Sequence, residues 1–381
     1  MNNRIDGLLR RATGLVRRGD PAAATRAIQE ALGGGSPPGT GLPGADLPDA
    51  APPSAGGAMP RAGALRDALR AVAAARPDAG SFRAGARAAP AAAPLPDGAK
   101  VLRGTVDTPR HGTRDWRLYV PSAARTGAPL PLVVMLHGCT QDADDFARGT
   151  RMDAVAEAAG AYALYPEQSA KANPQRCWNW FKHTHQGAAR GEPALILAAI
   201  DQVADAHAVD ADRVFVAGLS AGGAMAAILG ECAPERFAGV GVHSGLGAGS
   251  AHDMPSAFAA MQGQGGAVRA PRVPTIVFHG DADRTVAAVN AERLVEGVVR
   301  GSSGALARTD SVRANGRDCE RTIWSAADGA VTCETWTLGG AGHAWSGGDP
   351  AGSYTDASGP DASALMMDFF VARAARPARA A

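Results

Sequence analysis

The sequence has no long hydrophobic segment and almost no excess charge. No stretch approaches the roughly 18 uninterrupted apolar residues of a membrane-spanning helix. The first twenty residues lack the apolar block and small-residue cleavage site of a secretory signal, so we expect a cytoplasmic protein. With 38 basic and 37 acidic residues, the net charge of +1 gives no reason to expect nucleic acid as a partner.

Cysteine is scarce, and none of the five cysteines forms a C-x-x-C pair, so a structural zinc site is not expected. Cys232 lies in an apolar helical run, which predicts a buried free thiol. The other four could form two disulfides, and the pair Cys319–Cys333 is favoured because it would close a short loop. Disulfides indicate an oxidising compartment. Possible disulfides and the missing secretory signal thus point to different compartments, and we give the missing signal more weight.

Composition divides the chain into four expected parts. These are a helical hairpin at residues 1–32, a flexible linker at 33–98, a large domain at 99–375 and a basic tail at 376–381. Within the first part, Gly19-Asp20-Pro21 combines a helix end, an N-cap and a helix start. The Gly, Pro and Ala of the second part cannot offset ordering entropy by burial. A single hairpin cannot bury its own apolar face, so it could mediate self-association.

From about residue 100, short apolar runs alternate with helical segments. This pattern is typical of a mostly parallel sheet covered by helices. The runs PLVVML and RVFVAG are almost entirely apolar, as parallel strands buried on both faces are. Strands are expected at residues 132–136, 161–165, 214–217, 239–243, 275–278 and 335–338.

The run RVFVAG leads directly into the motif G-x-S-x-G, with Ser220 at its centre, and then into the apolar helical segment AGGAMAAILGEC. In an α/β-hydrolase this serine occupies a strained turn between strand and helix, and the flanking glycines let both elements approach closely. The motif alone is also compatible with a Gly-Ser loop. The strand before it and the helix after it favour an α/β-hydrolase fold with Ser220 as the nucleophile.

An oxyanion hole in this fold uses two backbone N–H groups. One belongs to the residue after the nucleophile, here Ala221, and the other to the loop after an early strand, where Cys139 is our choice. His137 precedes that loop. We interpret His137 as a side chain that braces the loop, not as the catalytic base.

The fold also requires the chain order serine, acid, histidine. The strand at 275–278 ends in HGDADRTV, and its Asp281 and Asp283 are nearly equal candidates on chemistry alone. His343 follows the last strand in the glycine-rich segment GGAGHAW. Such a triad would hydrolyse an ester through an acyl-enzyme, although it could also cleave amides. The pair His183 and His185 lacks a third ligand nearby, and no metal or organic cofactor is implied.

Several separated motifs then point to one family. In order, they are LHGCTQDADDFARGT, YPEQS, CWNWF, GLSAGGAMA, VGVHSG, HGDADRTV and GAGHAWSGG. Together they closely resemble the poly(3-hydroxybutyrate) depolymerase family of serine esterases, which borders on the feruloyl and acetyl-xylan esterases. The resemblance covers roughly residues 100–372 and implies the triad Ser220, Asp283 and His343. It places the oxyanion hole near Cys139 and suggests a Cys139–Cys177 bridge beside the site.

The resemblance also implies a substrate, namely a poly- or oligo(3-hydroxyalkanoate) ester. Trp178, Trp180 and Trp345 lie in or near the shared motifs and could offer aromatic surfaces to such a chain, unless they belong to the core. Many members of the family are secreted, which makes an extracellular location the alternative, and the hairpin could contact granules. The rival hypotheses are a feruloyl or acetyl-xylan esterase and a non-catalytic binding protein on a hydrolase scaffold.

Overall fold

The computed structural model describes residues 94–301 and 305–374. The hairpin expected at residues 1–32, the tail at 376–381 and all of the linker before residue 94 lie outside the described residues. Self-association or granule contact through the hairpin is therefore not supported by the structure. No described helix is long and apolar enough to cross a membrane.

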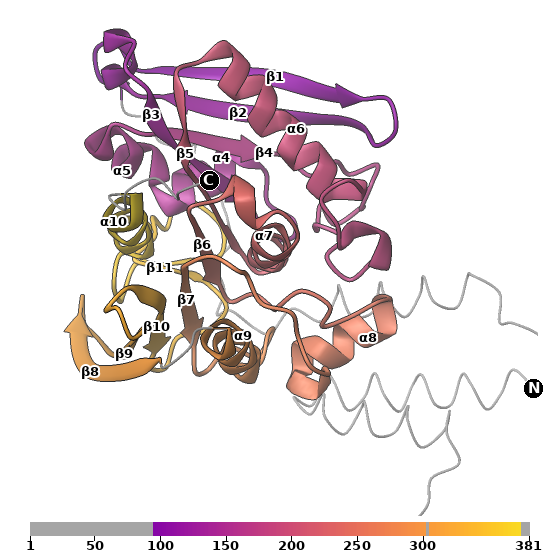
Figure 1. The fold of residues 1–381 in the computed structure, drawn as a ribbon, viewed down its shortest axis with the longest axis vertical. Coiled ribbons are helices and arrows are strands. Elements are labelled where there is room, and N and C mark those ends of the chain that lie inside the picture. Colours follow the sequence, from indigo (N-terminus) through magenta and orange to yellow (C-terminus); the bar gives the residue numbers. More distant parts are fainter. Residues whose placement is uncertain (1–93, 302–304, 375–381) are drawn as a thin grey trace, which may run out of the picture. The chain divides into compact units, whose positions relative to one another are not determined.

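One large sheet runs through the described residues in the strand order β1-β2-β4-β3-β5-β6-β7-β10-β9-β8 (Figure 1). Its strands are β1 (Lys100–Thr108), β2 (Gly112–Val120), β3 (Leu130–Leu136), β4 (Tyr162–Pro166), β5 (Val209–Leu219), β6 (Gly239–His243), β7 (Thr275–Gly280), β8 (Leu306–Ala314), β9 (Arg317–Ser325) and β10 (Val331–Leu338). The central strands from β4 to β10 in this order pair in parallel. The β1–β2 and β8–β9 pairs extend the sheet with antiparallel strands at its two edges.

All six strands expected from the sequence are present, as β3, β4, β5, β6, β7 and β10. In β3 the last six residues are buried, as are all five residues of β6. Strands in these positions are covered by helices on both faces, which is why their sequences are apolar throughout rather than alternating. A short parallel pair, β11 (Trp345–Ser346) and β12 (Thr355–Asp356), stands apart from the large sheet.

Helices cover both faces of the sheet (Figure 1). They are α4 (Ala143–Thr150), α5 (Met152–Ala159), α6 (Gly191–Ala206), α7 (Ala221–Cys232), α8 (Met254–Ala259), α9 (Val289–Arg300) and α10 (Ala362–Ala374), with short helical turns η1 (Ser122–Thr126), η2 (His183–His185), η3 (Pro234–Arg236) and η4 (Ala260–Gln264). Buried side chains of α6, α7 and α9 form one core cluster with the sheet. Those of α4, α5 and α10 form a second cluster on the opposite face.

The predicted Cys319–Cys333 disulfide is wrong. Both cysteines are free, and they lie on the neighbouring strands β9 and β10. The register pairs Cys319 with Leu338 and Cys333 with Trp324, so the two cysteines are not opposite each other. Their side chains also belong to different core clusters, on opposite faces of the sheet. Cys232 is free as predicted, but it is half-buried; burial raises the pKa of its thiol to about 11.

Candidate active site

The sequence-predicted catalytic residues gather at one edge of the sheet. The predicted oxyanion donor Cys139 follows β3, Ser220 follows β5, Asp283 follows β7 and His343 follows β10. These four strands point in the same direction, because β3, β5, β6, β7 and β10 pair in parallel in that order. Their carboxyl ends therefore meet at one edge, which is where open α/β sheets bind ligands.

Ser220 occupies a strained turn between β5 and α7. Its backbone has φ 57° and ψ −118°, a conformation that non-glycine residues rarely adopt. The Ser220 N–H donates to the carbonyl of His243 on the neighbouring strand at 2.9 Å. The residue is partly exposed, whereas Leu219 and Ala221 on either side are buried. The turn thus carries the serine hydroxyl out of the packed interior.

Two glycines make this turn sterically feasible. A Cβ atom on Gly218 would lie 2.4 Å from the backbone carbon of Gly222, and one on Gly222 would lie 1.9 Å from the carbonyl oxygen of Leu136. Real Cβ atoms do not approach backbone atoms so closely, so any side chain would force the strand and helix apart. The close approach of strand and helix expected from G-x-S-x-G is present.

His343 and Asp283 are in direct contact. The His343 Nδ1 atom lies 2.6 Å from the Asp283 Oδ2 atom, and the carboxylate is fully buried. Its other oxygen accepts the N–H groups of Thr285 at 2.8 Å and Val286 at 2.9 Å. Burial alone would raise the pKa of Asp283, but the hydrogen bonds from His343 and Val286 hold it below its usual value. Because the carboxylate holds Nδ1, Nε2 is the imidazole nitrogen left for proton transfer.

The nearby Asp281 has a different environment. Its side chain is exposed, and its carboxylate accepts the N–H of Gly340 at 2.7 Å, in the segment that leads to His343. Asp281 therefore supports the histidine loop from outside, whereas Asp283 touches the imidazole. Among the described residues, no hydrogen bond joins the Ser220 hydroxyl to His343; catalytic hydrogen bonds often tighten only when substrate is bound.

The loop after β3 lies against the nucleophile. A Cβ atom on Gly138 would lie 3.7 Å from Ser220 Cβ. Within this loop, the Gly138 N–H donates to Gln141 Oε1 at 2.9 Å and the Thr140 N–H donates to Gln175 O at 2.6 Å. Among the hydrogen bonds of the described residues, none is donated by the backbone N–H of Cys139. The same holds for Ala221, the first residue of α7, so neither predicted oxyanion donor has an acceptor among the hydrogen bonds of the described residues.

A disulfide and a buried histidine fix the shape of this loop. Cys139 is bonded to Cys177, as the family resemblance suggested. His137 is fully buried, with Nδ1 2.7 Å from Gly138 O and Nε2 accepting the Gln168 N–H at 3.0 Å. Burial lowers the pKa of His137 to about 4, so the ring is neutral near pH 7. Both ring nitrogens are occupied by the backbone, which is the bracing arrangement expected from the sequence.

Sequence reasoning missed Glu192, a fully buried carboxylate on α6. It accepts the backbone N–H and the side-chain amide of Asn179, each at 2.6 Å, and also the side-chain amide of Gln168. That amide donates in addition to Cys177 O at 3.0 Å. Glu192 thereby ties the CWNWF segment, which contains the disulfide cysteine Cys177, to α6 and to Gln168. An acidic residue at the start of the apolar run GEPALILAAI was the signal available in the sequence.

His243 was also missed. It is fully buried, and its ring lies 5.7 Å from that of Phe278 and 5.1 Å from that of Trp345, stacked on both. Its Nε2 accepts the N–H of Ser346 at 3.1 Å, while its carbonyl accepts the N–H of Ser220. Burial lowers its pKa to about 3, so the ring is neutral. His243 thus connects the nucleophile turn to the segment just after His343.

The structure corrects the interpretation of the three tryptophans. Trp178 is 0%, Trp180 5% and Trp345 1% exposed, and all belong to the core clusters. The Trp345 indole N–H donates to Ser363 Oγ at 3.1 Å, which satisfies this buried polar group. These side chains pack in the core clusters of the sheet and leave at most 5% of their surface to solvent.

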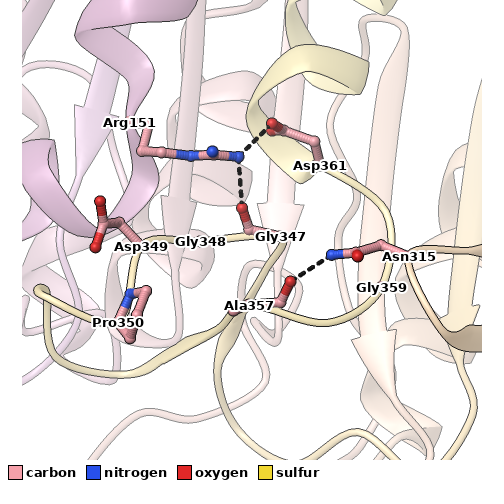
Figure 2. Close-up of a pocket in the computed structure, with 9 residues that line it drawn as sticks. All are labelled: Arg151, Asn315, Gly347, Gly348, Asp349, Pro350, Ala357, Gly359 and Asp361. Carbon is pink, nitrogen blue, oxygen red and sulfur yellow. Dashed lines mark hydrogen bonds and ion pairs between the residues drawn. The ribbon is translucent and has the colours of Figure 1, made fainter.

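A cavity of about 430 Å³ is lined in part by residues 347–350, which follow His343 in the sequence (Figure 2). Arg151 crosses it and donates to Gly347 O at 2.8 Å and to Asp361 Oδ2 at 2.6 Å. None of the predicted catalytic residues lines it.

The residues that the structure describes contain no group of three or more His, Cys, Asp or Glu that could hold a metal ion. His185, of the H-x-H pair, instead faces Glu192, with 3.3 Å between Nδ1 and Oε2.

Comparison with known proteins places the chain in a family. Residues 114–321 match the model of the esterase PHB depolymerase family. The chain belongs to this family. Poly(3-hydroxyalkanoate) depolymerase C of Paucimonas lemoignei is 30% identical over 240 residues, covering 59% of this chain and 57% of that protein. Poly(3-hydroxybutyrate) depolymerase of Ralstonia pickettii is 29% identical over 270 residues, covering 63% and 53%. The chain thus spans little more than half the length of these two relatives.

Other esterases match over a shorter segment or in fold alone. Feruloyl esterase B of Thermothelomyces thermophilus is 30% identical over 141 residues, covering 37% of this chain and 47% of that protein. The solved structure of an acetyl xylan esterase from Aspergillus awamori aligns with a TM-score of 0.51 at 20% identity, covering 64% of this chain and 94% of that one. The predicted α/β-hydrolase fold and the family resemblance are both confirmed.

Proposed function

We propose that this member of the PHB depolymerase family is a serine carboxylic ester hydrolase that acts on poly- or oligo(3-hydroxyalkanoate) esters. The observation that carries the proposal is the 2.6 Å contact between His343 and a fully buried Asp283, at the sheet edge where the strained Ser220 turn lies. A buried carboxylate that orients an imidazole, at the sheet edge that also carries a partly exposed serine, is the arrangement that activates a hydroxyl nucleophile.

The proposed reaction has two halves. His343 Nε2 takes the proton of Ser220 as its Oγ attacks the ester carbonyl, and the oxyanion accepts hydrogen bonds from the N–H groups of Cys139 and Ala221. The C–O bond to the alcohol breaks, and the alcohol leaves with the proton from His343. Water then attacks the acyl-enzyme by the same route and releases the acid and free Ser220. Asp283 stabilises the imidazolium in both halves.

The substrate class is supported by the names of the relatives. Both the Paucimonas and the Ralstonia proteins are depolymerases of hydroxyalkanoate polyesters. A second candidate, a feruloyl or acetyl-xylan esterase, is favoured by the similarity to feruloyl esterase B and to the acetylxylan esterase A of Aspergillus oryzae. Both candidates share the chemistry and differ only in the acyl and alcohol groups that the site accepts.

The catalytic test compares matched variants on p-nitrophenyl butyrate. Ser220→Ala should abolish turnover, and Asp283→Asn should lower kcat by about 10⁴-fold because the imidazole loses its orienting charge. Asp281→Asn is the control, because an amide oxygen can still accept the Gly340 N–H; we expect less than a tenfold loss. Equal losses in the two aspartate variants would contradict the assignment of Asp283. An inert but folded wild type would favour the non-catalytic binding scaffold.

A substrate panel then separates the two candidates. The purified protein is assayed on 3-hydroxybutyrate dimer and trimer, methyl ferulate and acetylated xylan, with release of each acid measured directly. The proposal expects the hydroxybutyrate oligomers to have the highest kcat/KM. Faster hydrolysis of ferulate or acetyl groups than of either oligomer would establish the second candidate instead.

We further propose that the enzyme works in an oxidising compartment, in contrast to the cytoplasmic expectation. The support is the Cys139–Cys177 disulfide, because such bonds persist in exported proteins and are rare in the cytosol. Thiol labelling of the protein in fractionated producing cells tests this. Enzyme found mainly in the cytosol with both thiols reduced would refute the proposal.

A further inference from the structure

Tyr354 stands at the rim of the proposed site. Its hydroxyl lies 3.3 Å from Thr140 Oγ1, in the loop that carries the oxyanion donor Cys139. Its carbonyl accepts the N–H of Trp345 at 2.8 Å, two residues after His343. Tyr354 therefore contacts the oxyanion loop through its side chain and the histidine loop through its backbone.

The side chain is also unusually exposed for an aromatic residue. Tyr354 is 47% exposed, whereas the tryptophans expected to meet the substrate are buried. In the described part of the chain, Phe258 on α8 is the other aromatic residue with a similar exposure, at 46%. Its helix lies in the segment between β6 and β7 and not in the loops that carry Thr140 and His343, so Phe258 serves as a control that is matched in exposure.

The backbone at this position is strained and firmly held. Tyr354 has φ 52° and Thr140 has φ 66°, both in the left-handed region that non-glycine residues rarely occupy. Next to Tyr354, the Ser353 N–H donates to Asp145 Oδ1 at 2.9 Å, and its carbonyl accepts the Gln141 amide at 3.0 Å. The same Gln141 holds the N–H of Gly138. Such strain persists only where surrounding contacts enforce it, and it concentrates at ligand sites.

We propose that Tyr354 contacts the substrate and determines specificity, its ring forming a wall for the part of the ester beyond the scissile bond. This inference rests on the proposed ester hydrolase function and names a contact that the buried tryptophans do not provide. An aromatic ring offers an apolar face to the methyl and methylene groups of a hydroxyalkanoate unit. Its hydroxyl, held by Thr140, keeps that face beside the oxyanion loop.

The test compares wild type, Tyr354→Ala, Tyr354→Phe and Phe258→Ala. Each is assayed for kcat and KM on p-nitrophenyl acetate, p-nitrophenyl octanoate and the 3-hydroxybutyrate trimer. Tyr354→Ala should lower kcat/KM by about tenfold on octanoate and trimer, mainly through KM, and by less than twofold on acetate. Tyr354→Phe keeps the ring and should stay within about threefold of wild type on all three esters. Phe258→Ala should match wild type.

Three kinetic outcomes would overturn the inference. Equal losses of kcat/KM on acetate and on trimer in Tyr354→Ala would mean that Tyr354 only supports the loops. Equal losses of kcat/KM in Tyr354→Ala and Phe258→Ala would mean that exposed aromatic side chains bind the esters nonspecifically. Unchanged kinetics in Tyr354→Ala would also refute it.

A binding measurement separates this inference from the proposed function. Calorimetric titration of trimer into Ser220→Ala, with and without Tyr354→Ala, reports contact without turnover. A Kd raised about tenfold by the second substitution supports the contact even if wild type proves inert on every ester, in which case the hydrolase proposal alone fails. An unchanged Kd, or no trimer binding by Ser220→Ala, refutes the Tyr354 contact.

Discussion

The Cys139–Cys177 disulfide should support both stability and catalysis, and the double variant Cys139→Ala/Cys177→Ala separates the two effects. The bond joins residues 38 apart in sequence. Closing a loop of that length removes unfolded-chain entropy equivalent to about 4 kcal/mol. We therefore expect the free energy of unfolding to fall by up to about 4 kcal/mol, measured by urea denaturation.

The effect on catalysis should be smaller than complete loss of an oxyanion donor. Removing one donor typically lowers kcat by about 10²–10³-fold. Here the loop keeps two other anchors, namely the Thr140 N–H on Gln175 O at 2.6 Å and the Gly138 N–H on Gln141 Oε1 at 2.9 Å. The position of the Cys139 N–H would be held less tightly, but the group would stay near the place it has in the bridged loop. We expect kcat on p-nitrophenyl butyrate to fall about tenfold at a temperature where both proteins are folded.

Cys232→Ala provides the control, because it removes a half-buried free thiol without opening a loop. Its kcat should equal that of wild type. A double variant that loses stability but keeps full kcat would refute the idea that the disulfide positions the Cys139 N–H. A double variant as stable as wild type would refute the estimate from loop closure.

Two further predictions concern the packing and the protonation of the site. Gly222→Ala should lower the free energy of unfolding by about 3 kcal/mol or more, because the new Cβ would lie 1.9 Å from Leu136 O. Gly266→Ala is the control: no atom lies within 4 Å of its new Cβ, so the free energy of unfolding should change by less than about 0.5 kcal/mol. Similar urea midpoints for the two variants would contradict the close contact between strand and helix. Burial, together with the nearby His279 and His343, lowers the pKa of His243 from 6.5 to about 3, against the opposing effect of the Asp283 carboxylate. Its contribution to stability is therefore complete above pH 6.5 and is lost as the pH falls towards 3, by up to about 1.4 kcal/mol per pH unit. In a plot of the free energy of unfolding against pH, His243→Gln should reduce the slope between pH 3 and 6.5 by that amount. An unchanged slope would show that His243 is not held as a neutral, buried imidazole.

The central strands could be predicted because burial on both faces leaves a continuous apolar run in the sequence. The antiparallel pair β8 and β9 left no such signal. In β8 no residue is fully buried, and its sequence LARTDSVRA is largely polar. A strand at the sheet edge needs few apolar side chains, and pairing through its backbone is invisible in residue type.

Cysteine pairing failed for a related reason. Loop length favoured Cys319–Cys333, but strand register decides whether two cysteines on neighbouring strands meet, and the register here separates them. Burial of the tryptophans likewise depends on the helices and loops that cover them. Trp178 packs beside His137 with ring centres 5.7 Å apart, an arrangement that brings together segments far apart in sequence.

The parts of the site differ in how far apart in the sequence the residues that form them lie. The Ser220 turn is set by five consecutive residues, because the missing side chains of Gly218 and Gly222 alone permit the contact with Leu136. A pattern search can therefore recognise it. The rim is set instead by pairs more than two hundred residues apart, such as Thr140 with Tyr354 and Gln141 with Ser353. The nucleophile turn can therefore be encoded locally, whereas the proposed substrate contact of Tyr354 arises only when distant loops meet.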